Sequence, residues 1–182
     1  NNATYAAGIA VFAAEGTFNI KDCKNNGAIS AYRAGGVVYD VSDNGNGSIT
    51  GCTNTGAVTG AYDKVAGIVS VEDSAARNLT ISGCKNEGAI SGPNASAIYA
   101  GETTKRGDSA NTNSGTITAS GIRYISEDSV TLSSDMTSQI VIFAGSTVTI
   151  SGGTYSGKIE NKGTLTVTGG TFTGDNFFNE GT

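Results

Sequence analysis

The chain has 182 residues, a formal net charge of −5, and 27 glycines but only one proline. Gly, Thr, Ser and Asn together make up nearly half of it, and it contains neither tryptophan nor histidine. This composition disfavours helical bundles, α/β nucleotide-binding domains and collagen. The lack of histidine excludes a Ser-His hydrolase pair and a His-ligated zinc site within these residues. Acidic and basic side chains form no runs, so we expect no nucleic-acid partner.

The first 120 residues contain three copies of one motif and a fourth, degenerate copy. The motif reads I-x-x-C-x-N-x-G-A-[IV]-[ST] and begins at Ile20, Ile49 and Ile81, while in the fourth copy Asn111 stands in the Cys position. Each copy is accompanied by a small apolar segment of the type Ala-Gly-Ile-Val, and copies are 27 to 32 residues apart. β-branched residues alternating with polar ones between Asn-x-Gly turns indicate strands.

The last 36 residues repeat with a shorter period. The pattern T-[IV]-[ST]-G-G-T-[FY]-[ST]-G at 149–157 returns 17 residues later at 166–174, and Asn161-Lys162-Gly163 returns after 18 residues at Asn179. Repeats of fixed period indicate a solenoid, in which each repeat covers its neighbour.

These periods predict an all-β, single-stranded, right-handed parallel β-helix with three short strands per coil and roughly six or seven coils. We expect one domain over 1–182, with long coils in 1–120, a transition in 121–146 and short coils in 147–182. We also expect the short coils to continue beyond the C-terminus. An open coil end has unpaired strand edges, which favour end-to-end self-association.

Equal repeat positions should form ladders along the axis, because stacked strands lie about 4.8 Å apart. One ladder is expected from the cysteines and one from the motif asparagines. The ladder residues are Cys23, Cys52 and Cys84, and Asn25, Asn54, Asn86 and Asn113. The thiols are expected to fill a corner, although neighbouring ones lie within the separation of about 4.4 to 6.8 Å that a disulfide tolerates. One cysteine per coil without histidine predicts no metal site.

The asparagines are expected at bends, each followed two residues later by a glycine that supplies a positive φ. Tyr32 and Tyr62 occupy nearly equal positions after the cysteines. As an exposed row these two rings could hold a sugar, so they are the candidate ligand-binding residues. As an inward row they would only cover the core.

The two repeat patterns resemble the Gly-rich GLUG-type repeats and the β-helical stalk repeats of bacterial cell-surface adhesins. The resemblance implies a segment of a larger exported protein, located outside the cell or on the bacterial surface and used for adhesion or as a structural stalk. It implies a carbohydrate or a host surface protein as partner, with no catalytic residue and no cofactor. No stretch approaches 18 consecutive apolar residues, so we expect no direct membrane insertion.

The alternative is an enzyme acting on acidic polysaccharide, because pectate lyases and polygalacturonases share this scaffold. Such lyases and hydrolases need clustered carboxylates. Adjacent acids occur at Glu72-Asp73, near Arg77, and at Glu127-Asp128, near Arg123. Neither pair stands in a motif of those families, and both are expected in solvated loops. The sequence therefore favours a non-enzymatic role.

Overall fold

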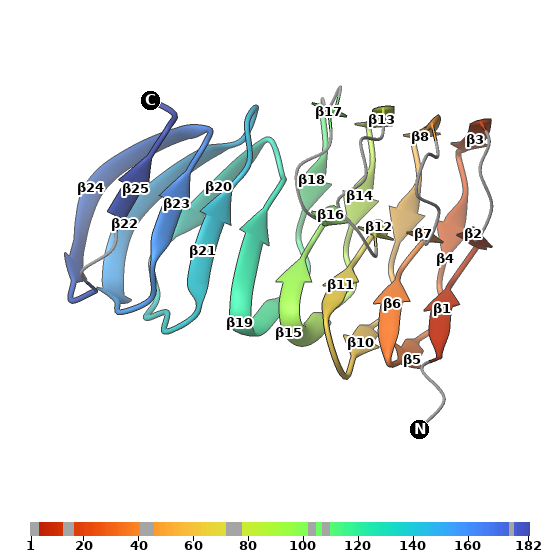
Figure 1. The fold of residues 1–182 in the computed structure, drawn as a ribbon, viewed down its shortest axis with the longest axis horizontal. Helices are drawn as coiled ribbons and strands as arrows, with labels where there is room; N and C mark the ends of the chain where they lie inside the picture. Colours follow the sequence, from red (N-terminus) through yellow and green to blue (C-terminus); the bar gives the residue numbers. More distant parts are fainter. Residues whose placement is uncertain are drawn as a thin grey trace.

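The computed structural model describes residues 4–12, 17–40, 46–71, 78–101, 105–106, 110–174 and 177–182. Within these ranges all regular structure is β-strand and every strand pairing is parallel, which confirms the all-β prediction. The described residues contain no helix long and apolar enough to span a membrane. Successive repeats follow one another along the long axis of the molecule, from the N-terminal end to the C-terminal end (Figure 1).

The strands belong to five parallel sheets. The long sheet runs the length of the molecule and contains β1 (Tyr5–Ala7), β6 (Arg33–Gly35), β11 (Lys64–Ala66), β15 (Ile90–Ser96), β19 (Ile117–Ile125), β21 (Gln139–Ile142), β23 (Ile159–Asn161) and β25 (Phe177–Asn179), with β5 (Ile29–Ala31) and β10 (Val58–Gly60) beside this path. The second sheet contains β2 (Ala10–Phe12), β7 (Val38–Asp40), β12 (Val69–Val71) and β16 (Tyr99–Ala100).

The third and fourth sheets contain the first half of the cysteine–asparagine motif of the long repeats, and the fifth contains the longest strands of the short repeats. The third contains β3 (Thr17–Lys21), β8 (Asn46–Thr50), β13 (Asn78–Ser82) and β17 (Lys105–Arg106). The fourth contains β4 (Lys24–Asn25), β9 (Thr53–Asn54), β14 (Lys85–Asn86) and β18 (Thr112–Asn113). The fifth contains β20 (Ser129–Leu132), β22 (Thr147–Tyr155) and β24 (Thr164–Phe172).

The three complete long repeats each contain five strands, not the three that were predicted. One of the two extra divisions comes from a bend just before the cysteine position, where Asp22, Gly51 and Gly83 have φ angles of 53°, 63° and 61°. Ala110 holds the same place before Asn111, with φ 56°. A positive φ ends an extended strand, so the motif is split between the third and fourth sheets. The other division separates the short strands β5 and β10 from β6 and β11.

The core consists of aliphatic ladders in the expected register. Ile20 pairs with Ile49, and Ile49 with Ile81, and all three are buried. A second ladder aligns Ile29, Val58, Ile90 and Ile117. In the short repeats the core is made of residues of β21, β22 and β23, including Ile140, Ile150 and Ile159. The apolar side chains of one repeat thus pack against those of the next, and their burial stabilises the fold.

Candidate functional site

The motif asparagines form a continuous ladder of side-chain amides. Asn25 Nδ2 donates to Asn54 Oδ1 (2.7 Å), Asn54 Nδ2 to Asn86 Oδ1 (2.8 Å), and Asn86 Nδ2 to Asn113 Oδ1 (2.8 Å). Each Nδ2 also donates to the carbonyl of the glycine two residues later, at 2.8 to 2.9 Å. Asn54 and Asn86 are fully buried. Because Asn25, Asn54 and Asn86 are buried and each amide is bonded within the row, the position of the row indicates a structural role.

The glycines of this turn do not supply the positive φ that was expected of them; the residue before the cysteine position does. A Cβ on Gly56 would meet the backbone carbonyl of Gly27, and one on Gly88 that of Gly56. Glycine is therefore required here because the stacked backbones approach each other closely. On the facing segment, a Cβ on Gly67 would meet the Asn86 amide, so the two motifs of the repeat pack together.

Each cysteine directly precedes the short strand that carries a ladder asparagine, so the cysteines lie in one row beside the asparagines. All three are reduced thiols in this structure, with Cys52 and Cys84 buried and Cys23 partly exposed. Cys52 Sγ donates to Ile20 O (3.8 Å), and Cys84 Sγ donates to Ile49 O (3.5 Å). In the fourth repeat Asn111 Nδ2 makes the equivalent bond to Ile81 O, at 2.7 Å. The thiol therefore closes the bend onto the preceding repeat, a contact that an asparagine can also make.

Tyr32 and Tyr62 form a stacked pair at one edge of the long sheet. Their ring centroids are 4.5 Å apart with planes at 10°, and Tyr62 is 54% exposed. Tyr62 N donates to Tyr32 O, which holds the two backbones in register. Tyr62 is exposed and Tyr32 partly exposed, and neither belongs to the buried core. Each ring covers one face of the other, so stacking leaves the second face of each ring free of its partner.

Charged and polar side chains surround this pair. The Arg33 guanidinium lies 5.5 Å from the centroid of the Tyr62 ring and 5.9 Å from that of Tyr5, within cation–π range. Arg33 also approaches Asp63 at 3.8 Å, and Asp63 Oδ1 accepts a hydrogen bond from Asn94 Nδ2 (2.9 Å). Partial desolvation, followed by the effect of the Tyr62 hydroxyl, raises the pKa of Tyr32, so its hydroxyl stays protonated at neutral pH.

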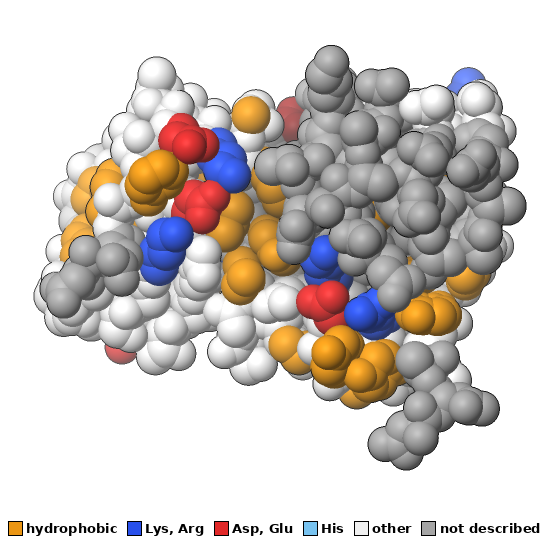
Figure 2. Space-filling model, viewed as in Figure 1, with side chains coloured by type: hydrophobic (Ala, Val, Ile, Leu, Met, Phe, Trp, Pro, Cys, Tyr) orange, Lys and Arg blue, Asp and Glu red, His pale blue; other side chains and the backbone are white. Residues whose placement is uncertain are grey.

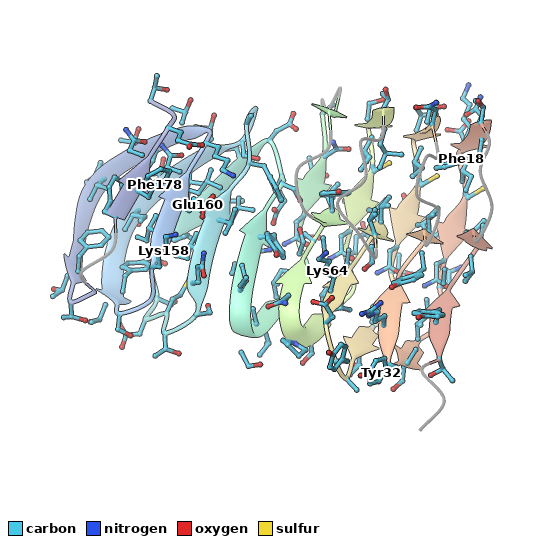
Figure 3. All side chains as sticks on the ribbon, in the orientation of Figure 1. Phe18, Tyr32, Lys64, Lys158, Glu160 and Phe178 are labelled. Carbon is cyan, nitrogen blue, oxygen red and sulfur yellow. The ribbon has the colours of Figure 1, made fainter. Side chains whose placement is uncertain are left out.

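We call this surface the tyrosine patch and define it as Tyr5, Tyr32, Arg33, Tyr62, Asp63 and Asn94. These residues lie in or just before β1, β6, β11 and β15, which are side by side in the long sheet. Figure 2 shows apolar side chains gathered with Lys or Arg and Asp or Glu side chains at this end of the molecule, and Figure 3 places Tyr32 at the same edge.

A hollow of about 250 Å³ lies farther along the same face of the long sheet. Its lining includes Tyr124 and Phe143, whose rings stack at 5.6 Å, together with Glu160 and Lys162. Glu160 Oε1 lies 2.9 Å from Lys162 Nζ, and its other oxygen lies 3.5 Å from Lys158 Nζ. Figure 3 shows Lys158, Glu160 and Phe178 close together here. The Glu160 carboxylate in this hollow is therefore already paired with lysine ammonium groups.

The Glu127 carboxylate, expected in a solvated loop, is buried. It lies between β19 and β20 and is 1% exposed. Arg123 Nη2 donates to Glu127 Oε1 (2.6 Å), while Ser126 N donates to the other oxygen (2.9 Å). Arg123 pairs in register with Ile140, a core residue, so its guanidinium is directed inward and needs this anion. The solvated-loop prediction was therefore wrong for Glu127.

Asp128 is also occupied by a structural contact. Its two carboxylate oxygens accept hydrogen bonds from Ala110 N (2.6 Å) and Asn111 N (3.1 Å). It thereby holds the left-handed bend at Ala110 in place. The other acidic pair, Glu72-Asp73, and Arg77 lie outside the described residues. In the described part of the chain, no group of three His, Cys, Asp or Glu side chains is placed to hold a metal ion.

Comparisons of the chain with protein-family models, with curated proteins and with solved structures find no match.

Repeat alignment identified Tyr32 and Tyr62 but not their surroundings. Tyr5, Arg33 and Asp63 were missed because they follow no repeat pattern. The one available signal was position: Arg33 and Asp63 each directly follow one of the two tyrosines in sequence. A second asparagine pair was also available from the Asn-x-Gly pattern. Asn161 Nδ2 donates to Asn179 Oδ1 (2.7 Å), so stacked asparagine amides also join the short repeats.

Proposed function

We propose that this chain is a non-enzymatic segment of a secreted or cell-surface bacterial protein. In this proposal it is a right-handed parallel β-helix that acts as an adhesion module or structural stalk. The parallel register of equal repeat positions supports the β-helix, because each long repeat passes through the same sheets in the same order, and the short repeats alternate between the long sheet and the fifth sheet. The resemblance of its repeats to the GLUG-type and adhesin stalk repeats supports the location.

We propose further that the tyrosine patch contacts glycans. The observation that carries this proposal is the exposed Tyr32 and Tyr62 stack, flanked by the Arg33 and Asp63 pair. The C–H groups of a sugar ring pack against the face of an aromatic ring, while tyrosine hydroxyls, a guanidinium and a carboxylate bond its hydroxyl groups. Glu127 and Asp128 are held by structural contacts, which leaves them no role as an acid–base pair.

The experiment is a glycan-array screen followed by titration of the strongest ligand, monitored by NMR. The Tyr62→Ser variant is expected to bind at least about tenfold more weakly, equivalent to about 1.4 kcal/mol. The matched control is Phe178→Ser, because Phe178 is also an exposed aromatic (51%) but lies at the other end of the molecule. Equal affinity of wild type and Tyr62→Ser would contradict the assignment of the patch.

The enzymatic alternative is tested on the same preparation. Polygalacturonate is incubated with the wild-type chain, and both new reducing ends and unsaturated uronides are measured. We expect neither product above the protein-free control. Turnover that depends on the intact chain would contradict the non-enzymatic proposal.

A further inference from the structure

The three cysteines lie in register on successive repeats. Lys24 pairs with Thr53, and Thr53 with Lys85, so the cysteines just before them are adjacent along the stack. Thr53 N donates to Cys23 O and Lys85 N to Cys52 O, both at 2.9 Å. Neighbouring cysteines are thus one strand spacing apart, about 4.8 Å, which lies within the Cα separation that a disulfide tolerates.

The two outer cysteines are too far apart to bridge each other. Cys23 and Cys84 are separated by two strand spacings, roughly 9.6 Å, and a disulfide cannot form when Cα atoms are more than about 7 Å apart. Cys52 is therefore the common partner of both. Cys23 is partly exposed, whereas Cys52 and Cys84 are buried, so of the three residues Cys23 is the one that a reagent can reach from solvent.

We propose that this corner is a thiol–disulfide site in which Cys23 is the entry thiol and Cys52 the resolving thiol, with a low-molecular-weight disulfide as oxidant. The Cys23 thiolate attacks one sulfur of the reagent, forming a mixed disulfide and releasing the first thiolate. The Cys52 thiolate then attacks Cys23 Sγ, forming the bond between the two repeats and releasing the second. Two protein thiols lose their protons and two electrons, and the reagent is reduced to two thiols.

The surroundings of Cys52 suit the resolving role. Hydrogen bonding from the neighbouring Cys84 thiol is the main cause that lowers the pKa of Cys52 to about 6. By contrast, burial and the adjacent Cys52 raise the pKa of Cys23. Most of the thiolate at neutral pH is therefore on Cys52, next to the Cys23 sulfur that it must attack in the second step. In the first step Cys23 reacts through the small deprotonated fraction of its own thiol.

The test treats the folded 182-residue chain with oxidised glutathione, counts the remaining thiols after denaturation and maps the disulfide by peptide mass spectrometry. We expect loss of two of the three thiols and a Cys23–Cys52 bridge. Cys84→Ser, the matched control, should form the same bridge. Cys52→Ser should form no internal bridge and should accumulate a mixed disulfide of Cys23 with glutathione.

As a control, circular dichroism is used to check that each variant is folded. If Cys52→Ser is not, Cys52→Asn takes its place, since Asn111 holds the same position in the fourth repeat and bonds the same type of carbonyl. A Cys23–Cys84 bridge, a Cys52–Cys84 bridge as the sole product, or three intact thiols after oxidation of the folded chain would each overturn the proposal.

Discussion

Asn54 shows how one residue type holds successive repeats together. Its buried amide donates to the Asn86 amide and to Gly56 O, and it accepts from Asn25 Nδ2. Every polar atom of this side chain thus has a partner, and each of those partners depends on it. The ladder works because glycines on the facing segment leave room for it; a Cβ on Gly36 would meet the Asn54 side chain.

The Asn54→Ala variant should be destabilised by about 2 to 4 kcal/mol, because it removes the amide donor to Gly56 O and to Asn86 Oδ1 and one of the two acceptors of Asn25 Nδ2 in a buried site. Urea denaturation followed by circular dichroism measures this. Asn113→Ala is the matched comparison, since Asn113 is only partly buried, and should lose less. Equal losses at both positions would mean that burial of the ladder does not determine its contribution.

For individual residues, the sequence predicts which side chains are neighbours better than it predicts backbone conformation. Repeat alignment assigned the asparagines to one row, because equal positions of stacked strands must be neighbours. It put the positive φ at Gly27, Gly56, Gly88 and Gly115, whereas it occurs at the residue before the cysteine position. Asp22 and Ala110 hold that conformation without being glycine, so residue type alone could not reveal the bend.

The turn between β19 and β20 contains the least expected element of the structure. Strand β19, which leads from the long to the short repeats, carries Arg123 on its core side. Arg123 Nη2 lies 2.6 Å from Glu127 Oε1, so the carboxylate neutralises the buried guanidinium. The side chains are 6% and 1% exposed. Such a pair cannot be derived from repeat periodicity, because it lies in the transition where neither repeat pattern holds.

Arg123→Met should cost about 3 to 5 kcal/mol, because it leaves the Glu127 carboxylate buried without its cation. The double variant Arg123→Met/Glu127→Gln should recover most of this loss, since glutamine still accepts from Ser126 N and carries no charge. Urea denaturation of wild type, both single variants and the double variant gives the coupling energy. Strictly additive losses would show that the two side chains do not depend on each other.

Strand β23 provides a pH-dependent contribution through Glu160. Hydrogen bonding to Lys162, supported by Lys158, lowers the pKa of Glu160. Since the folded-state pKa is the lower one, this stabilisation is complete above the ordinary pKa of glutamate and is lost as the pH falls through the folded value. We expect a contribution of about 1 kcal/mol or less, because the lysines remain partly exposed.

Urea denaturation at pH 7 and pH 3 measures this effect. Glu160→Gln should show a smaller loss of stability on acidification than wild type, whereas replacement of the exposed Glu180 by Gln should leave the loss unchanged. An identical pH dependence in Glu160→Gln and wild type would contradict the role given to the two lysines.

In the molecule as a whole, repetition accounts for what could be predicted. The all-β class, the parallel direction and the aliphatic rows, such as Ile20 with Ile49, follow from periods that bring equal positions together. Features that occur once could not be predicted this way. The tyrosine patch combines two repeat positions with Tyr5, Arg33 and Asp63, which belong to no pattern, so only the folded arrangement shows them as one surface.

The central claim is that successive repeats stack in parallel register, since the tyrosine patch and the cysteine row both depend on it. The most direct test is a NOESY spectrum of the isotope-labelled chain. We expect contacts at separations of one repeat, such as the side-chain amides of Asn25 and Asn54, which are 29 residues apart, and those of Asn161 and Asn179, 18 apart. Antiparallel hairpin contacts across the Asn-x-Gly turns, without these long-range contacts, would contradict the account.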